Sequence, residues 1–175
     1  MKLMTKRLVL RKPSLKDAKD LAKNGNEKSM FYFTWYIPYP FTIPKAKKII
    51  KWLNKKSRKK SLETIAFCIV PKDENKAVGI VDIYDIDKRD KKAKIGYWIG
   101  KRYRGKGFTS EAVKGVLNLA FDKLKLNKVS ADTLIDNYSS NALLGKLGFR
   151  RIGIKKKDKV INGKALDCFA WEIIK

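Results

Sequence analysis

The residues best suited to chemistry lie in one short basic segment, Arg102-Tyr-Arg-Gly-Lys-Gly-Phe-Thr109. The segment joins an expected strand to an expected helix, where successive backbone N–H groups can surround an anion. Gly105 and Gly107 allow the backbone to approach phosphate oxygens, and Arg104 and Lys106 add positive charge. The Lys-Ser/Thr ending of a Walker A loop and the third glycine of a dinucleotide fingerprint are both missing. Taken alone, the segment predicts either an ordinary basic turn or a phosphate-binding turn.

The composition excludes several kinds of catalysis. Histidine is absent from the 175 residues, so Ser-His-Asp and Cys-His mechanisms and histidine-based metal sites are ruled out. The two cysteines, Cys68 and Cys168, lie far apart in apolar segments. We therefore expect them to be reduced core residues, not zinc ligands or a disulfide framework, and we expect no metal.

The charge of the chain is strongly positive. Lysine and arginine number 42 against 17 acidic residues, a formal net charge of +25. Nucleic acid, a phosphate-rich cofactor and a lysine-rich proteome each explain such an excess. The apolar fraction of 44% suffices for a packed core, and no apolar run reaches transmembrane length or resembles a signal peptide. We expect one soluble, cytoplasmic domain over residues 1–175.

Hydrophobic periodicity predicts the elements that must position the basic segment. The expected strands are residues 7–11, 64–70, 77–86, 93–99, 128–134, 149–154 and 165–174, and the expected helices are 14–24, 42–60, 109–124 and 139–147. Residues 27–41, rich in aromatic side chains and containing Pro38 and Pro40, are expected to form a loop. This order indicates a mixed α+β sandwich and not a doubly wound sheet.

Four motifs occur in a familiar order: Ile95-Gly-Tyr-Trp-Ile99, the basic segment, Asp136-Asn137-Tyr-Ser-Ser140-Asn141 and Lys146-Leu-Gly-Phe149. With them the chain resembles the GNAT superfamily of acetyl-CoA-dependent N-acetyltransferases. Within it, the resemblance is to the Rim-type enzymes that acetylate protein N-termini, ribosomal proteins among them. The resemblance implies the GNAT fold, a mixed, mostly antiparallel central sheet flanked by helices on both faces.

The resemblance also implies roles for individual residues, with acetyl-CoA as co-substrate. The pyrophosphate would be held by Arg104, Gly105, Lys106, Gly107, Phe108 and Thr109. The strand Tyr97, Trp98 and Ile99 would pair with the pantetheine arm, which Asn137 would also reach. Ser140 would protonate the leaving thiolate. One position departs from many relatives: Leu144 stands where they carry a tyrosine acid, so Ser140 or water must take that role.

An amine attacks a thioester directly, so the chemistry needs a base, an oxyanion donor and a proton for the thiolate. Glu63 and Asp82 are the candidate bases, although each could equally be a surface or salt-bridged carboxylate. Lys94 stands where many relatives carry an acidic residue, which argues against a base there.

The aromatic residues 30–41 fit either an edge of the core or a wall of the acceptor cleft. Lys45–Lys60 contains nine basic and no acidic residues, so it is either a solvated face or a docking surface for an acidic or ribosomal partner. We expect an enzyme that acetylates a protein N-terminal α-amine. A polyamine or aminoglycoside acetyltransferase and a non-catalytic basic nucleic-acid-binding module are the alternatives, and monomer and dimer stay open.

Overall fold

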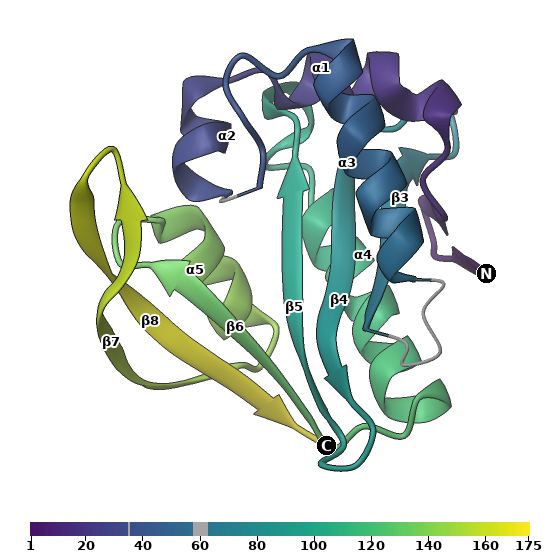
Figure 1. Cartoon of the computed structure of the whole chain (residues 1–175). Helices are drawn as coiled ribbons and strands as arrows, with labels where there is room; N and C mark the ends of the chain where they lie inside the picture. The colour runs from purple at the N-terminus through teal and green to yellow at the C-terminus, as the bar shows by residue number, and fades with distance from the viewer. Residues whose placement is uncertain (35, 58–62) are drawn as a thin grey trace.

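The computed structural model describes residues 1–34, 36–57 and 63–175. One eight-stranded sheet runs through these residues in the order β1-β2-β3-β4-β5-β6-β8-β7 (Figure 1). The strands are β1 (Lys2–Met4), β2 (Leu8–Arg11), β3 (Thr64–Pro71), β4 (Gly79–Asp87), β5 (Lys92–Ile99), β6 (Lys128–Leu134), β7 (Arg150–Ile161) and β8 (Lys164–Ile174). Neighbouring strands are antiparallel except β5 and β6, which run parallel.

Helices cover both faces of the sheet (Figure 1). They are α1 (Ala18–Gly25), α2 (Lys28–Phe33), α3 (Ile43–Lys56), α4 (Phe108–Asn118) and α5 (Tyr138–Lys146). Alternate residues of β3 enter two separate cores, because successive side chains of a strand point to opposite faces. Cys68 packs with α1 and α3 on one face, and Phe67 packs with α4 and α5 on the other. The predicted mixed, mostly antiparallel sheet with helices on both faces is confirmed.

The sheet opens between its two parallel strands. Pairing of β5 with β6 covers only Lys92 to Lys94 on β5 and ends at the pair Lys94–Ser130. Beyond that pair β5 stays on β4 and β6 stays on β8, so the two halves of the sheet diverge (Figure 1). The last residues of β5 therefore present one backbone edge to the gap and not to a neighbouring strand.

Helix α2 and strand β1 were not predicted. Residues 28–33, expected to lie in a loop, form α2, which begins after Glu27 and buries Met30 before the prolines interrupt the chain. Residues 2–4 form β1, which pairs with β2. Such a short edge strand has too few residues to show a period.

Other elements begin or end elsewhere than predicted. Strand β7 continues to Ile161 instead of ending near Ile154. Most of its side chains are exposed, so its sequence has no alternating apolar pattern from which its length could be predicted. Helix α4 gives way at Leu119 to a π-helical turn that ends at Lys123. Helix α3 ends at Lys56; the expected continuation to Lys60 lies outside the described residues. In the part of the chain that the structure describes, no helix is long and apolar enough to span a membrane.

Candidate active site

The basic segment forms a turn with exposed backbone N–H groups at the start of α4. Gly105 and Gly107 have φ of 74° and 77°, in the left-handed region that favours glycine. From Gly105 to Gly107 no backbone N–H donates to any described residue, and the first N–H groups of α4 have no acceptor within the helix. A Cβ built on Gly105 would meet no atom within 4 Å. The turn is thus open, rich in donors and suited to an anion.

A network around Arg7 holds this turn, which local sequence reasoning did not find. The guanidinium of Arg7 donates to the carbonyl of Lys106 at 2.9 Å and to Glu111 at 2.8 Å, and it lies over the Phe108 ring. Glu111 also accepts hydrogen bonds from Thr5 and from the backbone of Arg7. Burial opposes ionisation of Glu111, but these bonds outweigh it and hold its pKa below the usual value. The network fixes the first turn of α4 against β2.

A second contact ties the turn to α2. Arg104 donates to Glu27 at 3.0 Å, and Glu27 also accepts from the backbone N–H of Lys101. The Lys106 ammonium lies 5.6 Å from the centre of the Tyr103 ring. The charge of Arg104 is therefore already paired, which leaves the main-chain N–H groups as the principal anion donors of the turn.

The free edge of β5 contains the strand residues that were predicted to contact the donor. The N–H of Gly100 donates to the carbonyl of Val78, the residue before β4. Alternate residues of a strand direct their backbone groups to the same side, so Trp98 also directs its N–H and C=O to β4. Tyr97 and Ile99 consequently direct their N–H and C=O groups to the gap. The Trp98 indole is 4% exposed and lies in the core with α1 and α3. Only two of the three predicted strand residues can therefore pair with an extended ligand in the gap.

The asparagine–serine motif forms the N-terminal turn of α5. Asn137 is its N-cap, and its Oδ1 accepts from the Ser140 N–H at 3.2 Å. Asn141 makes different contacts, since its amide donates to the carbonyls of Leu134 and Ile135, and its Oδ1 accepts from Trp171. These bonds fix α5 to the end of β6. The motif thus places Ser140 at the mouth of the gap.

Ser140 faces Tyr97 across the gap. The two hydroxyl oxygens are 2.7 Å apart, and either can be the donor. Ser140 is 9% exposed and Tyr97 is half-buried. Leu144, one helical turn further along α5, is fully buried and offers no hydroxyl group. The structure thus brings the predicted Ser140 together with a side chain that the sequence analysis considered only for its backbone.

Asp82 is one of the two candidate bases. It lies on β4, beside the part of β5 that borders the gap. It pairs in register with Gly96, and a Cβ at Gly96 would come within 2.7 Å of Asp82 Oδ1. Asp82 is 5% exposed, and Oδ1 accepts no hydrogen bond from the described residues. Burial raises the pKa of Asp82 to about 7. A carboxylate that titrates near neutral pH suits a general base.

Glu63 lies further along the sheet. It precedes β3 by one residue, and its carbonyl accepts from the Ile86 N–H. In β3, Ala66 is the register partner of Asp82, so Glu63 is three residues away from that row. Tyr84, in contrast, shares the face of Asp82, and burial together with the Asp82 charge raises the pKa of its hydroxyl.

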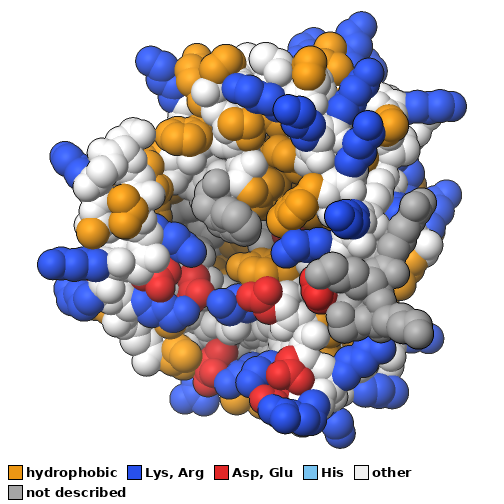
Figure 2. Space-filling view, in the orientation of Figure 1, with side chains coloured by type: hydrophobic (Ala, Val, Ile, Leu, Met, Phe, Trp, Pro, Cys, Tyr) orange, Lys and Arg blue, Asp and Glu red, His pale blue; other side chains and the backbone are white. Residues whose placement is uncertain are grey.

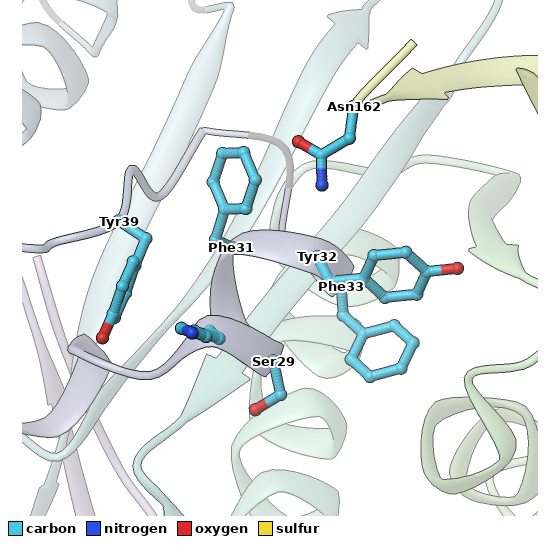
Figure 3. A pocket seen from close by; sticks show the side chains of 7 residues that line it. Ser29, Phe31, Tyr32, Phe33, Tyr39 and Asn162 are labelled. Atoms are coloured by element: carbon cyan, nitrogen blue, oxygen red, sulfur yellow. The ribbon is translucent and has the colours of Figure 1, made fainter. Parts of the chain in front are cut away.

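An open groove adjoins the gap on the side of α2. Figure 2 shows a hollow in this face of the molecule, with hydrophobic side chains around it and acidic ones along its lower side. Side chains from α2, from the segment after it and from the tip of the β7–β8 hairpin surround a cavity of about 510 Å³ (Figure 3). Its lining includes Phe31, Tyr32, Phe33, Tyr39 and Asn162. The aromatic segment therefore forms a wall of this cavity.

A smaller cavity of about 180 Å³ continues from this groove to β6, where it is lined by Asp132 and Leu134. The Tyr32 hydroxyl donates to Asp136 at 2.8 Å, which links α2 to the segment before α5. No group of three or more metal-ligating side chains occurs among the described residues. A donor-rich turn, a free strand edge and a buried carboxylate thus lie around one opening of the sheet, an arrangement suited to an extended ligand that carries phosphate.

Comparison with known proteins agrees with this class. Residues 7–150 match the acetyltransferase (GNAT) domain family. An N-acetyltransferase p20 of Bacillus licheniformis is 29% identical over 99% of this chain and 96% of its own length. The [ribosomal protein uS5]-alanine N-acetyltransferase of Escherichia coli is 26% identical over 58% of this chain and 53% of its own. A crystal structure of ribosomal-protein-S5-alanine acetyltransferase from Vibrio fischeri superposes with a TM-score of 0.84 at 24% identity, covering 99% and 96% of the two chains.

The chain belongs to the GNAT family of acetyltransferases. It is an N-acetyltransferase that uses acetyl-CoA as its acetyl donor, and its relatives include ribosomal-protein acetyltransferases, as the motifs predicted. The alternative of a non-catalytic nucleic-acid-binding module is therefore not retained. The match to the Escherichia coli enzyme spans about half of that protein, so its acceptor is not transferred to this chain by similarity alone.

The open turn predicts a selective loss of acetyl-CoA affinity in Gly105→Ala. The added Cβ occupies the space expected for phosphate oxygens, and the positive φ of 74° costs about 1 kcal/mol of stability. We expect calorimetry to show about a tenfold weaker Kd. Gly148→Ala is the matched control, because Gly148 has φ of 88° but lies at the far end of α5. Equal affinities in the two variants would contradict the assignment.

The buried Asp82 predicts a pH-dependent stability. Its pKa of about 7 lies above the ordinary 3.8, so the folded state retains a proton that the unfolded state releases. Asp82 therefore stabilises the fold below about pH 4 relative to neutral pH, and that contribution is lost as pH rises to about 7. In Asp82→Asn we expect denaturant unfolding to show no such loss of the free energy of unfolding between pH 4 and 8. The native chain should lose on the order of 4 kcal/mol by pH 8.

The exposed Asp85→Asn is the control for this measurement, because Asp85 lies on the same strand with a side chain 65% exposed. Parallel stability curves for Asp82→Asn and the native chain between pH 4 and 8 would show that Asp82 is ionised throughout.

Proposed function

We propose that the chain acetylates the α-amino group of a protein N-terminus, with ribosomal proteins as the acceptor class. The observation that carries this proposal is the form of the groove. Enclosed pockets bury most of a small ligand, whereas this groove lies open between α2 and the β7–β8 hairpin (Figure 3). An extended N-terminal segment can enter such a groove and present its first nitrogen to the gap. A cytoplasmic location is part of the proposal, since such acceptors and acetyl-CoA occur there.

The donor would lie in the gap. Its pyrophosphate would contact the N–H groups of the turn from Gly105 to Thr109, and its pantetheine arm would follow Tyr97, Ile99 and Asn137. This donor supplies an activated acetyl thioester. The main-chain N–H groups of β5 are fixed by the sheet, so they can stabilise negative charge on the thioester oxygen without rearrangement.

Asp82, rather than Glu63, would serve as the base, directly or through water. It lies opposite Gly96, and its Oδ1 fills the position that a side chain at Gly96 would need. With a pKa of about 7, Asp82 is sufficiently ionised at neutral pH to accept the proton of the acceptor ammonium. Ser140 would donate a proton to the departing sulfur from the opposite side of β5.

A small cationic amine is the second candidate, because acidic residues gather near the groove in spite of the net charge of +25. Asp132 lines the smaller cavity. Asp132 and Asp85 each have a carboxylate oxygen 3.8 Å from the ammonium of Lys94. A polyamine or aminoglycoside favours such surroundings. Lys94 and Lys155 offset much of this negative charge, since both contact Asp132. We therefore place the small amine second.

The acceptor is tested by an acetyl-CoA turnover assay on four substrate classes: N-terminal peptides of ribosomal proteins, the intact proteins, polyamines and aminoglycosides. We expect kcat/KM for N-terminal acceptors to exceed that for the small amines by at least about tenfold, which corresponds to about 1.4 kcal/mol. Peptides with a blocked N-terminus control for reaction at lysine side chains. Faster turnover of polyamines than of every free N-terminus would replace this acceptor with the small amine.

The outer face of α3 predicts salt-dependent recruitment of an acidic protein. Ala46, Ile50 and Leu53 bury the inner face, so Lys47, Lys48, Lys51 and Lys55 point to solvent. Replacing these four lysines by Gln is expected to raise KM several-fold for an intact acidic acceptor at low ionic strength, because long-range attraction is lost. KM for the short peptide with the same N-terminus should not change.

A charge-matched control replaces Lys2, Lys88, Lys114 and Lys123, all exposed and in other parts of the chain. An equal effect of the two quadruple variants would mean that only the net charge matters. The lysines at 59 and 60, expected to extend this face, lie outside the described residues.

A further inference from the structure

The hydrogen bond between Tyr97 and Ser140 joins two elements that the open sheet otherwise separates. Tyr97 lies on β5 and Ser140 in the first turn of α5, 43 residues later, with their oxygens 2.7 Å apart. Tyr97 packs against the core of the α4 and α5 face, opposite to the face of Trp98. The pair therefore lies at the gap, on the side opposite Asp82.

The chemistry of the leaving group demands a proton at this place. When a C–N bond forms to the acetyl carbon, the C–S bond breaks and the sulfur leaves with its electron pair. Ser140 is placed to protonate this sulfur, but an alkyl hydroxyl is a much weaker acid than a thiol. Its donation is unfavourable unless its own oxygen gains a proton in the same step. Leu144 supplies no hydroxyl to help, because its side chain is aliphatic and fully buried.

We propose that the Tyr97 hydroxyl is a positioning residue that orients Ser140 and replaces the proton which Ser140 gives to the sulfur. The inference rests on the proposed function of Ser140 as the acid. The sulfur takes a proton from Ser140 Oγ, Oγ takes the proton of Tyr97, and the phenolate takes one from water. The acceptor ammonium releases two protons in becoming an amide, so the complete reaction releases one net proton to solvent.

The surroundings of Tyr97 suit this role. The ring is half-buried. The backbone of Ser140 is fixed by the hydrogen bond that its N–H donates to Asn137. Burial raises the pKa of Tyr97 to about 12, although the Ser140 hydrogen bond opposes the rise. At neutral pH the phenol is thus fully protonated and is the stronger acid of the two hydroxyls. Negative charge passes to the phenolate instead of remaining on an alkoxide.

The first test is Tyr97→Phe, which retains the ring and removes only the oxygen. We expect kcat to fall by about 10–100-fold while Kd for acetyl-CoA stays within about twofold. In Ser140→Ala, kcat should fall at least as far. In the double variant, kcat should fall no further than in Ser140→Ala, because both residues act on one proton. Tyr138→Phe is the matched control: Tyr138 is on the same helix turn and 79% exposed.

The second test measures binding and not turnover. A pair that donates to sulfur should make the native chain bind CoA, at a pH where its thiol is ionised, several-fold more tightly than desulfo-CoA. Tyr97→Phe and Ser140→Ala should both lose this preference. A purely structural bond would instead change the affinities for the two compounds equally, which would overturn the proposal, as would additive losses in the double variant.

The failure of this inference is distinguishable from that of the acceptor assignment. If Ser140→Ala loses kcat and Tyr97→Phe retains it, the relay is wrong and the acetyltransfer scheme stands. If no free N-terminus is turned over, the acceptor assignment fails, while the comparison of CoA with desulfo-CoA still decides the role of Tyr97.

Discussion

The end of strand pairing at Lys94 and Ser130 is the constraint on which the rest of the site depends. Up to that pair the two halves of the sheet share hydrogen bonds, and beyond it each half keeps its pairing only on the outer side. Backbone groups left without a strand partner must be satisfied in another way. In the proposed function, an extended donor arm pairs with these groups in place of the missing strand. The turn before α4 and the first turn of α5 are placed at this opening because each follows directly from one of the diverging strands.

Much of this arrangement could be predicted from local patterns. The strand over 128–134 was predicted with its observed bounds. The basic turn was also accessible to prediction, since two glycines in a charged segment before a helix indicate a backbone of unusual conformation. These features depend on residues that are close in sequence, so the hydrophobic period or the residue preferences of a turn can predict them.

The contacts that hold the site were not predictable in this way. Arg7 and Glu111 are 104 residues apart, so only the packing of β2 against α4 brings them together. The hydroxyl of Tyr97 is a similar case. Its motif explains the strand, but the partner on α5 depends on the angle at which the sheet opens. Helix α2 was missed because its six residues are too short for a clear period and lie among loop-like aromatic residues and prolines.

The alternation of side chains along β5 has a consequence for how such an enzyme can change its acceptor. Gly96 borders the buried carboxylate on one face, and the next residue, Tyr97, contacts Ser140 on the other. In the proposed scheme, amine activation and thiol departure therefore take place on opposite faces of a single strand. If the scheme holds, substitutions on the α2 side would change which amine is accepted and would leave the residues that contact the coenzyme unchanged. The acceptor amine can therefore change in evolution while the residues that act on the thioester stay the same.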